Sequence, residues 1–467
     1  MPSFYVENFG CRATQADGAA IERQFREHGL ERAGALSQAQ IVVLNTCTVT
    51  ASADQDARAA IRRIQRENPG CQIVVTGCYA QRAPQELASL PGVRQVIGNS
   101  HKHQLVEIVL PASGANNHAA SADLDSIFVS DIFAHTELLA APVFDAACDR
   151  TRPNLKVQDG CDNRCSFCVI PYVRGQSRSL PLPQVLHEVT ALVASGYREV
   201  VISGINLGRW GRDLQTENWE PTSDNWPSSR QRPTIRRQQP HFEDLVRAIL
   251  ERTALEKLRI SSVEPMDWSD DLIGLVAESP RVAKHAHVPM QSGSDRVLRA
   301  MHRKYRPWHY REKLEKIRVA MPNAAIGTDV MAGVPGETDA DFEETRRMVE
   351  ELPFTYLHVF TYSSRPGTPS AAMRNQVPVQ VARERNRILR DLAAEKKLAF
   401  MRLFVGKPLE AITLNIAHSG PDGDFTEALT DNYLKLRLAG HHEPNRWVKA
   451  QVSQVVGGAL VGALIAG

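Results

Sequence analysis

The chain has 467 residues, of which 43% are hydrophobic and 23% are charged, as in an ordinary globular protein. Its net charge of +2 excludes an overall polyanion-binding character, so any contact with RNA has to come from local basic patches. The N-terminus has no basic stretch before an apolar core, which argues against a secretory signal, and the apolar C-terminus is too short and glycine-rich to span a bilayer. We therefore expect a cytoplasmic protein without a membrane partner, in which eight cysteines serve metal or redox chemistry and not disulfides.

Short apolar strands alternate with helices over the first hundred residues. The expected strands are Phe4–Asn8, Ile41–Asn45, Ile73–Thr76 and Val93–Ile97, and helices are expected from Asp17, Ala53 and Pro84. Such alternation predicts an α/β domain over residues 1–110, in which a parallel sheet carries helices on its faces.

Three cysteines, Cys11, Cys47 and Cys78, each follow one of these strands within a few residues. Because ligands bind outside the carboxyl ends of the strands in such a sheet, we expect the three thiols to converge on one rim and hold a metal cluster. Small buried cysteines also pack at strand ends, but three at equivalent positions favour a cluster. Cys71 and Cys148 are interpreted as packing residues.

A second cysteine group, Cys161, Cys165 and Cys168, follows a linker expected over residues 111–150. Three thiolates at this spacing can hold three irons of a four-iron cluster and leave the fourth iron without a protein ligand. A vacant position suits the binding and activation of a small molecule, whereas structural metal sites are usually closed. A zinc site completed by a remote ligand is the alternative, but zinc ribbons favour two Cys-x2-Cys pairs and the sequence has no second pair.

Six strand-like runs separated by helical stretches predict repeated β/α units that form a partial barrel over residues 151–378. The expected strands are Leu155–Gln158, Glu199–Ser203, Lys257–Ile260, Ala286–Pro289, Ala325–Val330 and Tyr356–Phe360. Since barrel chemistry is located at the carboxyl ends of the strands, the polar motifs found there are candidates for cofactor binding. The candidates are Gly204, Asn206, Ser262, Glu264 and Gln291. Asp329 and Glu337 are either further candidates or structural partners of neighbouring groups.

The rest of the chain holds an insertion, a long helix and a small barrel. Residues 212–240 are rich in Pro, Ser, Trp and Arg and are interpreted as a solvated surface loop, with a supplementary tRNA contact as the alternative. A connecting helix is expected over residues 379–403. Short strands broken by Gly, Pro, Asp and Asn over residues 404–467 predict a β-barrel of a type that often binds oligonucleotides. Its candidate RNA contacts are Tyr433, Lys435, Arg437, His441, His442 and Arg446.

The run Cys161-x3-Cys165-x2-Cys168, with Phe167 before the third cysteine, resembles the signature of radical S-adenosylmethionine enzymes. A second three-cysteine set upstream of it resembles the methylthiotransferases within that group. The resemblance covers nearly the whole chain and implies a methylthiotransferase domain, a radical domain and a C-terminal RNA-binding barrel of the TRAM type. It also implies two 4Fe-4S clusters and S-adenosylmethionine as cofactors, with both cysteine sets catalytic. Phe167, beside the second cysteine set, either borders the adenine of the cofactor or is a packing residue.

Two motifs, Asn45-Thr-Cys-Thr-Val-Thr50 and Val75-Thr-Gly-Cys-Tyr-Ala-Gln81, resemble the branch that acts on N6-threonylcarbamoyladenosine in tRNA. The isopentenyladenosine and ribosomal-protein branches usually carry other residues after the cysteine of the first motif. One departure from the family is Thr14, where Asn is normal, and it affects a contact of the first cluster but not a ligand.

The resemblance therefore implies methylthiolation of adenine C2 in N6-threonylcarbamoyladenosine at position 37 of tRNA. The expected partners are a tRNA with an ANN-type anticodon and an electron donor of the flavodoxin or ferredoxin type, and no DNA. The alternatives are a methylthiotransferase for isopentenyladenosine or for a ribosomal protein, and a non-catalytic iron–sulfur protein that binds RNA.

Overall fold

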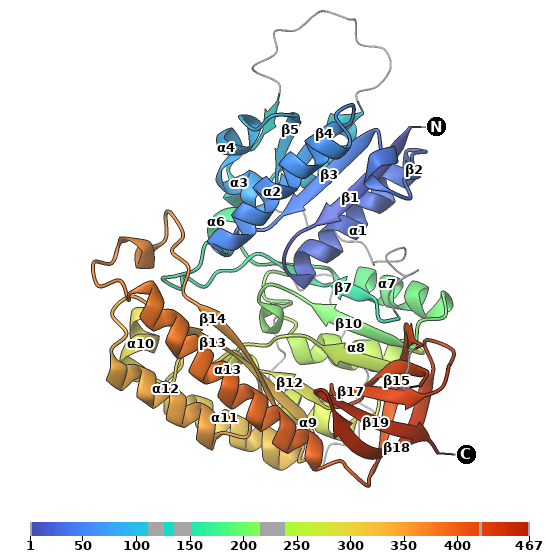
Figure 1. Cartoon of the computed structure of the whole chain (residues 1–467), viewed down its shortest axis with the longest axis vertical. Helices are drawn as coiled ribbons and strands as arrows, with labels where there is room; N and C mark the ends of the chain where they lie inside the picture. Colours follow the sequence, from blue (N-terminus) through green and yellow to red (C-terminus); the bar gives the residue numbers. More distant parts are fainter. Residues whose placement is uncertain (1, 111–125, 135–150, 215–238, 420–422, 466–467) are drawn as a thin grey trace, which may run out of the picture. The chain divides into compact units, whose positions relative to one another are not determined.

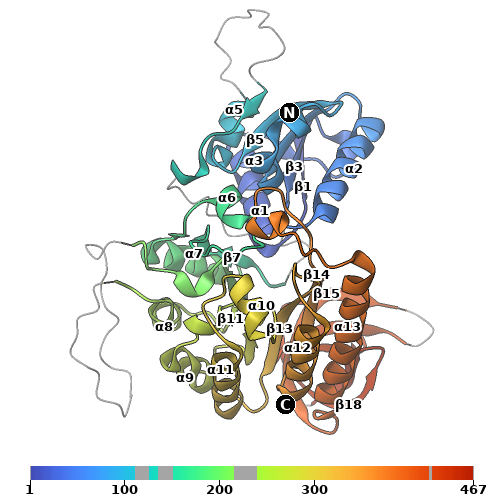
Figure 2. The ribbon, with the colours of Figure 1, turned by 90° about the vertical axis from the view of Figure 1, so that its left-hand side faces the viewer.

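The computed structural model describes residues 2–110, 126–134, 151–214, 239–419 and 423–465 (Figures 1 and 2). The chain divides into two compact units. The first comprises Met1–Asp145, Asn154–Leu180 and Ser363–Ala372, and the second comprises Ala146–Pro153, Pro181–Tyr362 and Met373–Gly467. Most of the expected insertion, residues 215–238, lies outside the described residues. Among the described helices, none combines the length and the apolar character needed to cross a bilayer.

A six-stranded parallel sheet in the order β2-β1-β3-β4-β5-β6 forms the centre of the first unit (Figure 1). Its strands are β1 (Ser3–Asn8), β2 (Glu31–Arg32), β3 (Ile41–Thr46), β4 (Gln72–Gly77), β5 (Val93–Gly98) and β6 (Ile127–Phe128). The helices of this unit are α1 (Arg12–Glu27), α2 (Ala51–Glu67), α3 (Cys78–Arg82), α4 (Pro84–Ala88), α5 (Leu105–Val109) and α6 (Ile170–Arg174). The four expected strands are confirmed. The edge strands β2 and β6 were not expected, because two residues carry too little pattern to be recognised.

Both faces of this sheet are covered, which explains why the central strand β3 begins with four consecutive apolar residues, 41–44. In β3, Val42 and Leu44 belong to one buried cluster, and Ile41 and Val43 belong to the other. Helix α2 contributes to the first cluster, while α1 and α5 contribute to the second. Burial on both faces gives a parallel strand its continuous hydrophobic sequence. The well-packed sheet fixes the starting points of the loops that follow β1, β3 and β4.

Parallel strands with helices between them also form the second unit. Its strands before the terminal barrel are β10 (Glu199–Ser203), β11 (Lys257–Ile260), β12 (His285–His287), β13 (Ala325–Ala332) and β14 (Tyr356–Thr361). Its helices are α7 (Leu182–Ala194), α8 (Phe242–Arg252), α9 (Asp270–Glu278), α10 (Asp295–Ala300), α11 (Pro307–Ala320), α12 (Asp339–Glu351) and α13 (Val379–Arg402). β10 pairs with β11, β12 pairs with β13, and β13 pairs with β14. An isolated bridge joins Ser262 to His287.

Five of the six strands expected in the central region are therefore confirmed in the second unit. The other expected strand, Leu155–Gln158, appears as two short strands of the first unit, β7 (Asn154–Lys156) and β8 (Gln158–Asp159), of which β8 pairs with β9 (Arg178–Ser179). The segment that carries the second cysteine set thus belongs to the same unit as the first set.

The C-terminal residues form a closed barrel in the order β15-β16-β17-β19-β18, as expected. Its strands are β15 (Pro408–His418), β16 (Phe425–Thr430), β17 (Lys435–Ala439), β18 (Trp447–Val456) and β19 (Ala459–Leu464). The long helix α13 lies along β14 (Figure 1), and its end, through Phe400 and Met401, packs into the apolar core of the barrel with Leu436 and Leu438. This shared core explains why the barrel is part of the second unit.

Candidate functional site

The first cysteine set lies at the carboxyl end of the sheet. Cys47 and Cys78 directly follow β3 and β4, and Cys11 lies in the short loop after β1. Cys11 precedes α1 as its N-cap, and Cys78 is the first residue of α3. Cys47 and Cys78 are buried, whereas Cys11 is exposed. Gly10, with a φ of +110°, packs so tightly on Cys47 that an added Cβ would lie 2.5 Å from the Cys47 Cβ and 3.0 Å from its Sγ. Glycine at this position thus lets the Cys11 loop approach Cys47.

The three thiols also influence one another electrostatically. Burial, reinforced by the neighbouring Cys78 and, more weakly, by Cys11, raises the pKa of Cys47 to about 12. Thiols placed this close resist deprotonation together, and a bound metal reverses that preference because it takes thiolates as ligands. The donor set therefore fits a metal cluster. Cys71 packs against the apolar cluster beside α2, as expected, and Cys148 lies outside the described residues.

Polar side chains hold two of these sulfurs in place. The Thr14 hydroxyl lies 3.6 Å from Cys11 Sγ, so the residue that departs from the family pattern still makes a polar contact with that cysteine. Asn99 donates from Nδ2 to Cys78 Sγ at 3.6 Å and to the Val173 carbonyl at 2.7 Å. Asn99 was not predicted from the sequence, because it lies just after β5 and is far from any cysteine along the chain.

The second cysteine set lies in the loop between β8 and α6. The Cys161 amide donates to the Gly175 carbonyl at 3.0 Å, and the Cys168 amide donates to the Cys165 carbonyl at 3.1 Å, so backbone hydrogen bonds close the loop. Its three cysteines and Phe167 are half-buried. At the base of the loop, Gly160 has a φ of +71°, and an added Cβ would lie 1.8 Å from a carbonyl oxygen. The loop therefore requires glycine there.

The helices that follow the two cysteine sets pack on each other within the first unit. Val169 and Val173, which follow Cys168, form a buried apolar cluster with Cys78. Asn99 joins the same two segments, because it contacts both Cys78 and Val173. The sequence predicted each set separately, and the structure places both in one compact unit.

A buried network of five charged side chains lies beside the first cysteine set, and we call it the ion network. It consists of Asp17, Lys102, Lys156, Asp159 and Arg174, whose side chains are at most 9% exposed. Asp17 contacts Lys102 at 3.0 Å, Arg174 at 2.9 Å and Lys156, while Asp159 contacts Lys156 and Arg174, each at 2.9 Å. Three cations and two carboxylates leave one positive charge in excess.

The ion network suits a neighbouring anionic site. Burial alone would raise the pKa of Asp17, but Lys102, Lys156 and Arg174 outweigh it and lower that pKa below its usual value. The Arg174 charge acts in turn on the thiols, because it opposes the rise in the pKa of Cys47. Sequence reasoning missed the network. The signal was a set of charged residues within segments predicted to be buried, such as Lys156 in an expected strand.

A second buried arginine holds the loop after β3. Arg365, from the segment Ser363–Ala372, donates to the Thr48 carbonyl at 3.1 Å and to Asp54 Oδ2 at 2.7 Å, and Arg82 binds the same carboxylate at 2.9 Å. Ser370 in that segment donates through its amide to the Ser166 carbonyl at 2.8 Å. One segment after β14 therefore contacts residues next to Cys47 and residues inside the second cysteine loop.

The strand-end candidates Gly204, Asn206, Ser262, Glu264 and Gln291 lie in the second unit. Gly204 and Asn206 follow β10, and Asn206 is buried. Ser262 bridges to β12, and Gln291, with a φ of 66°, bridges to Val330 in β13. Glu264 forms an ion pair with Arg303. Burial raises the pKa of Glu264, and the Arg303 charge reduces that rise without cancelling it.

Glu337 is accounted for by structural contacts. Its carboxylate accepts hydrogen bonds from the Gly333 amide at 2.7 Å and from Arg385 of α13 at 2.6 Å. It therefore fixes the turn after β13 to the long helix.

The RNA candidates of the barrel divide by exposure. Tyr433 is half-buried, with its ring centroid 4.5 Å from that of His285 and 5.4 Å from the Arg259 guanidinium, so it packs against the β/α core. Arg437 is also half-buried, and it lies over the Phe425 ring. Lys435, His441 and Arg446 are exposed. The exposed residues remain the predicted contacts for a phosphate backbone.

Two family descriptions match the chain. Residues 3–98 match the "Uncharacterized protein family UPF0004", and residues 155–349 match the "Radical SAM superfamily". Among solved structures, the radical S-adenosylmethionine methyltransferase TsrM from Kitasatospora setae is similar, with a TM-score of 0.54 and 14% identity over 79% of this chain and 77% of that chain. At that identity, the likeness concerns the fold alone.

Curated relatives match nearly the full length of the chain. The threonylcarbamoyladenosine tRNA methylthiotransferase MtaB of Aquifex aeolicus is 33% identical over 96% of this chain and 99% of its own. The protein of the same name from Bacillus subtilis is 34% identical, over 94% and 91% of the two chains. The tRNA-2-methylthio-N(6)-dimethylallyladenosine synthase of Novosphingobium aromaticivorans is 33% identical, over 88% and 86%.

Proposed function

Because the chain belongs to the radical S-adenosylmethionine methylthiotransferase family, we propose that it adds a methylthio group to C2 of N6-threonylcarbamoyladenosine at position 37 of tRNA. The observation that carries this proposal is the placement of two three-cysteine sets in one unit, with the first set beside a buried positive charge. A zinc ribbon or a simple iron–sulfur RNA-binding protein needs only one metal site.

We propose Cys161, Cys165 and Cys168 as the ligands of the radical 4Fe-4S cluster. The other 4Fe-4S cluster is assigned to the first cysteine set, Cys11, Cys47 and Cys78, with a role in carrying the sulfur. When bound, the radical cluster and S-adenosylmethionine supply the chemistry needed at an adenine C–H bond, which has no usefully acidic proton.

The chain's own residues bind and orient in this scheme. Asn99 and Thr14 hold sulfurs of the first cysteine set, and the excess positive charge of the ion network balances its thiolate ligands. Gly204, which has no side chain, permits close approach of the cofactor, while the contact with Arg303 holds the Glu264 carboxylate at the end of β11. The proposed contacts to S-adenosylmethionine are Phe167, Gly204, Asn206, Ser262, Glu264 and Gln291.

The proposed substrate rests on two supports. The motifs around Cys47 and Cys78 resemble the threonylcarbamoyladenosine branch, and relatives of that name match the chain over nearly its whole length. A relative named for dimethylallyladenosine is similar at a comparable identity, so that nucleoside is the second candidate. The protein would act in the cytoplasm on tRNA with an ANN-type anticodon and take electrons from a flavodoxin or ferredoxin.

Three cysteine variants test the assignment of the two cluster sites. Cys161→Ala should abolish formation of 5′-deoxyadenosine, and Cys78→Ala should preserve that cleavage while stopping methylthiolation. Cys71→Ala, outside both sets, is the matched control and should preserve both activities. Cleavage by Cys161→Ala at the wild-type rate, or methylthiolation by Cys78→Ala, would overturn the corresponding assignment.

The substrate is tested with two tRNA pools, one carrying threonylcarbamoyladenosine and one carrying dimethylallyladenosine. Each pool is incubated with the protein, S-adenosylmethionine and a chemical reductant, and the nucleosides are then analysed by mass spectrometry. The proposal predicts the methylthio product in the first pool only. Product in the second pool alone would keep the family chemistry and replace the substrate.

A further inference from the structure

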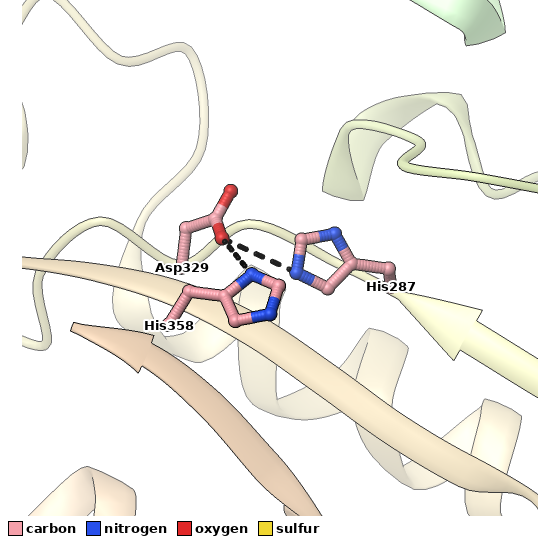
Figure 3. A group of neighbouring side chains, drawn as sticks. All are labelled: His287, Asp329 and His358. Atoms are coloured by element: carbon pink, nitrogen blue, oxygen red, sulfur yellow. Dashed lines mark hydrogen bonds and ion pairs between the residues drawn. The ribbon is translucent and has the colours of Figure 1, made fainter. Parts of the chain in front are cut away.

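Two histidines and a carboxylate from three adjacent strands meet in the second unit (Figure 3). His287 is the last residue of β12, Asp329 lies in β13, and His358 lies in β14 directly opposite Asp329 in the strand register. Sequence reasoning considered only Asp329. The two histidines lie in strands, and their convergence depends on the register of those strands.

The spacing of the three groups is that of ligands around one ion. His287 Nε2 lies 3.3 Å and His358 Nδ1 lies 3.2 Å from the same oxygen, Asp329 Oδ1, and all three ligand atoms lie within 4.8 Å of one another. Two atoms that each lie about 2.0–2.1 Å from a tetrahedral zinc ion are roughly 3.3 Å apart. Charge-assisted hydrogen bonds to a carboxylate are usually shorter, about 2.7–2.9 Å.

His287 supplies an independent indication of a ligand. The residue is 8% exposed, and its Nε2 is buried without a hydrogen bond among the described residues, although it faces Asp329. Buried polar atoms normally have a partner, so a nitrogen of this kind needs an explanation. A bound cation accepts the lone pair of a neutral imidazole and provides that partner.

The surrounding rings fix the orientation of His287. Its ring is nearly parallel to that of Tyr356, at an interplanar angle of 7° and a centroid distance of 5.9 Å. Tyr356 reaches across β13 because Gly327 has no side chain there. A Cβ added at Gly327 would lie 2.0 Å from the Tyr356 Cζ. The Tyr356 hydroxyl is then held by His285 Nε2 at 2.6 Å. A ligand held in one orientation before the metal arrives loses little freedom on binding.

The other side of the group is open to solvent. The side chain of His358 is 56% exposed and that of Asp329 is 23% exposed, so an ion can enter and can keep water or another small molecule as a further ligand. Three protein ligands with two imidazoles and one carboxylate are typical of sites that bind zinc or another divalent first-row metal with positions left for other ligands.

We propose that His287, Asp329 and His358 bind one divalent transition-metal ion, such as zinc, separately from the two cysteine sets. The site does not depend on the identity of the tRNA substrate.

Zinc binding to the full-length protein with both iron–sulfur clusters assembled tests the proposal. The protein is treated with a chelator, zinc is titrated against a chromophoric competitor, and zinc and iron are both counted. X-ray absorption at the zinc edge then reports the ligands, because Zn–N and Zn–O distances are about 2.0–2.2 Å while Zn–S distances are about 2.3 Å. We expect about one zinc with nitrogen and oxygen neighbours only.

The variants His358→Ala and Asp329→Asn should each weaken zinc binding by more than the roughly 10–100-fold typical of losing an outer partner of a metal ligand. His309→Ala, which removes an exposed histidine of α11 outside the group, is the control and should bind zinc like the wild type. Unchanged iron content verifies that each variant is folded and loaded. No retained zinc, zinc with sulfur neighbours only, or equal affinity in His358→Ala would overturn the proposal and leave Asp329 as a carboxylate packed between two histidines.

Discussion

Replacement of Asp17 by Asn is the most informative perturbation of the first unit. Asp17 is 1% exposed, and its carboxylate forms ion pairs with three cations. In the variant, Lys102 would lose this carboxylate and keep its hydrogen bond to the Asn45 side-chain oxygen at 3.3 Å. Removing one partner of a buried ion pair costs about 3–5 kcal/mol, because the remaining charge stays buried without compensation. That is a large share of the roughly 5–15 kcal/mol by which a native domain is stable.

Hydrogen exchange measured by mass spectrometry on peptides from α1 is the suitable assay. The chain contains two units, so a single unfolding curve would mix their transitions, whereas exchange reports the opening of α1 itself. We expect Asp17→Asn to lower the free energy of opening by about 3–5 kcal/mol at neutral pH. Since the pKa of Asp17 is lowered in the folded protein, its stabilisation is present above about pH 4 and is lost as the pH falls below that value.

Two further variants separate the ion network from a general effect on the helix. Glu27→Gln, on the same helix, breaks an exposed pair with Arg23 at 3.6 Å and should change the free energy by at most about 1 kcal/mol. Lys102→Met should lower the free energy of opening less in the Asp17→Asn background than in the wild type. In that background Lys102 has already lost the Asp17 carboxylate, so its removal breaks no ion pair with that residue. The reasoning would be refuted if Asp17→Asn changed the free energy of opening as little as Glu27→Gln does. It would also be refuted if the effects of Asp17→Asn and Lys102→Met on that free energy were strictly additive.

Three other predictions concern the thiols, the ion network and the strand packing. In the cluster-free protein, iodoacetamide should label the exposed Cys11 well before the buried Cys47, as peptide mass spectrometry can follow. Labelling of Cys47 should stay slow until the pH approaches its raised pKa of about 12. Equal labelling rates at pH 8 would contradict the burial of Cys47. Lys102→Met removes a positive charge beside the first cysteine set, so the midpoint potential of that cluster should fall by tens of millivolts in a spectroscopic redox titration; a rise would contradict the proposed charge balance. Gly327→Ala places a Cβ on Tyr356 and should lower the free energy of opening of β13 by roughly 1–3 kcal/mol, as hydrogen exchange on peptides from that strand can measure. An unchanged opening free energy would contradict the tight packing.

The strands were predictable because burial on both faces leaves a continuous apolar run, as in residues 41–44 of β3. The start of α1 was predicted too late, at Asp17 instead of Arg12, since Cys11 caps the helix without one of the usual N-cap side chains. The helix expected from Pro84 is α4, whereas the short helix α3, which begins at Cys78, was not expected.

The side-chain networks were not predictable in the same way. Asp17 and Lys102 are 85 residues apart along the chain, and Lys102 reads as a surface residue until the fold brings it to Asp17. Likewise, His287, Asp329 and His358 meet only through the register of three strands. Motif spacing reports ligands that are close in sequence, whereas contacts between distant segments depend on the fold.

The most direct test of the proposed function is nucleoside mass spectrometry on tRNA from a strain that lacks the gene and from the same strain complemented with it. The account predicts loss of 2-methylthio-N6-threonylcarbamoyladenosine in the deletion strain, accumulation of N6-threonylcarbamoyladenosine, and recovery of the product on complementation. An unchanged level of the methylthio nucleoside in the deletion strain would contradict the proposed substrate.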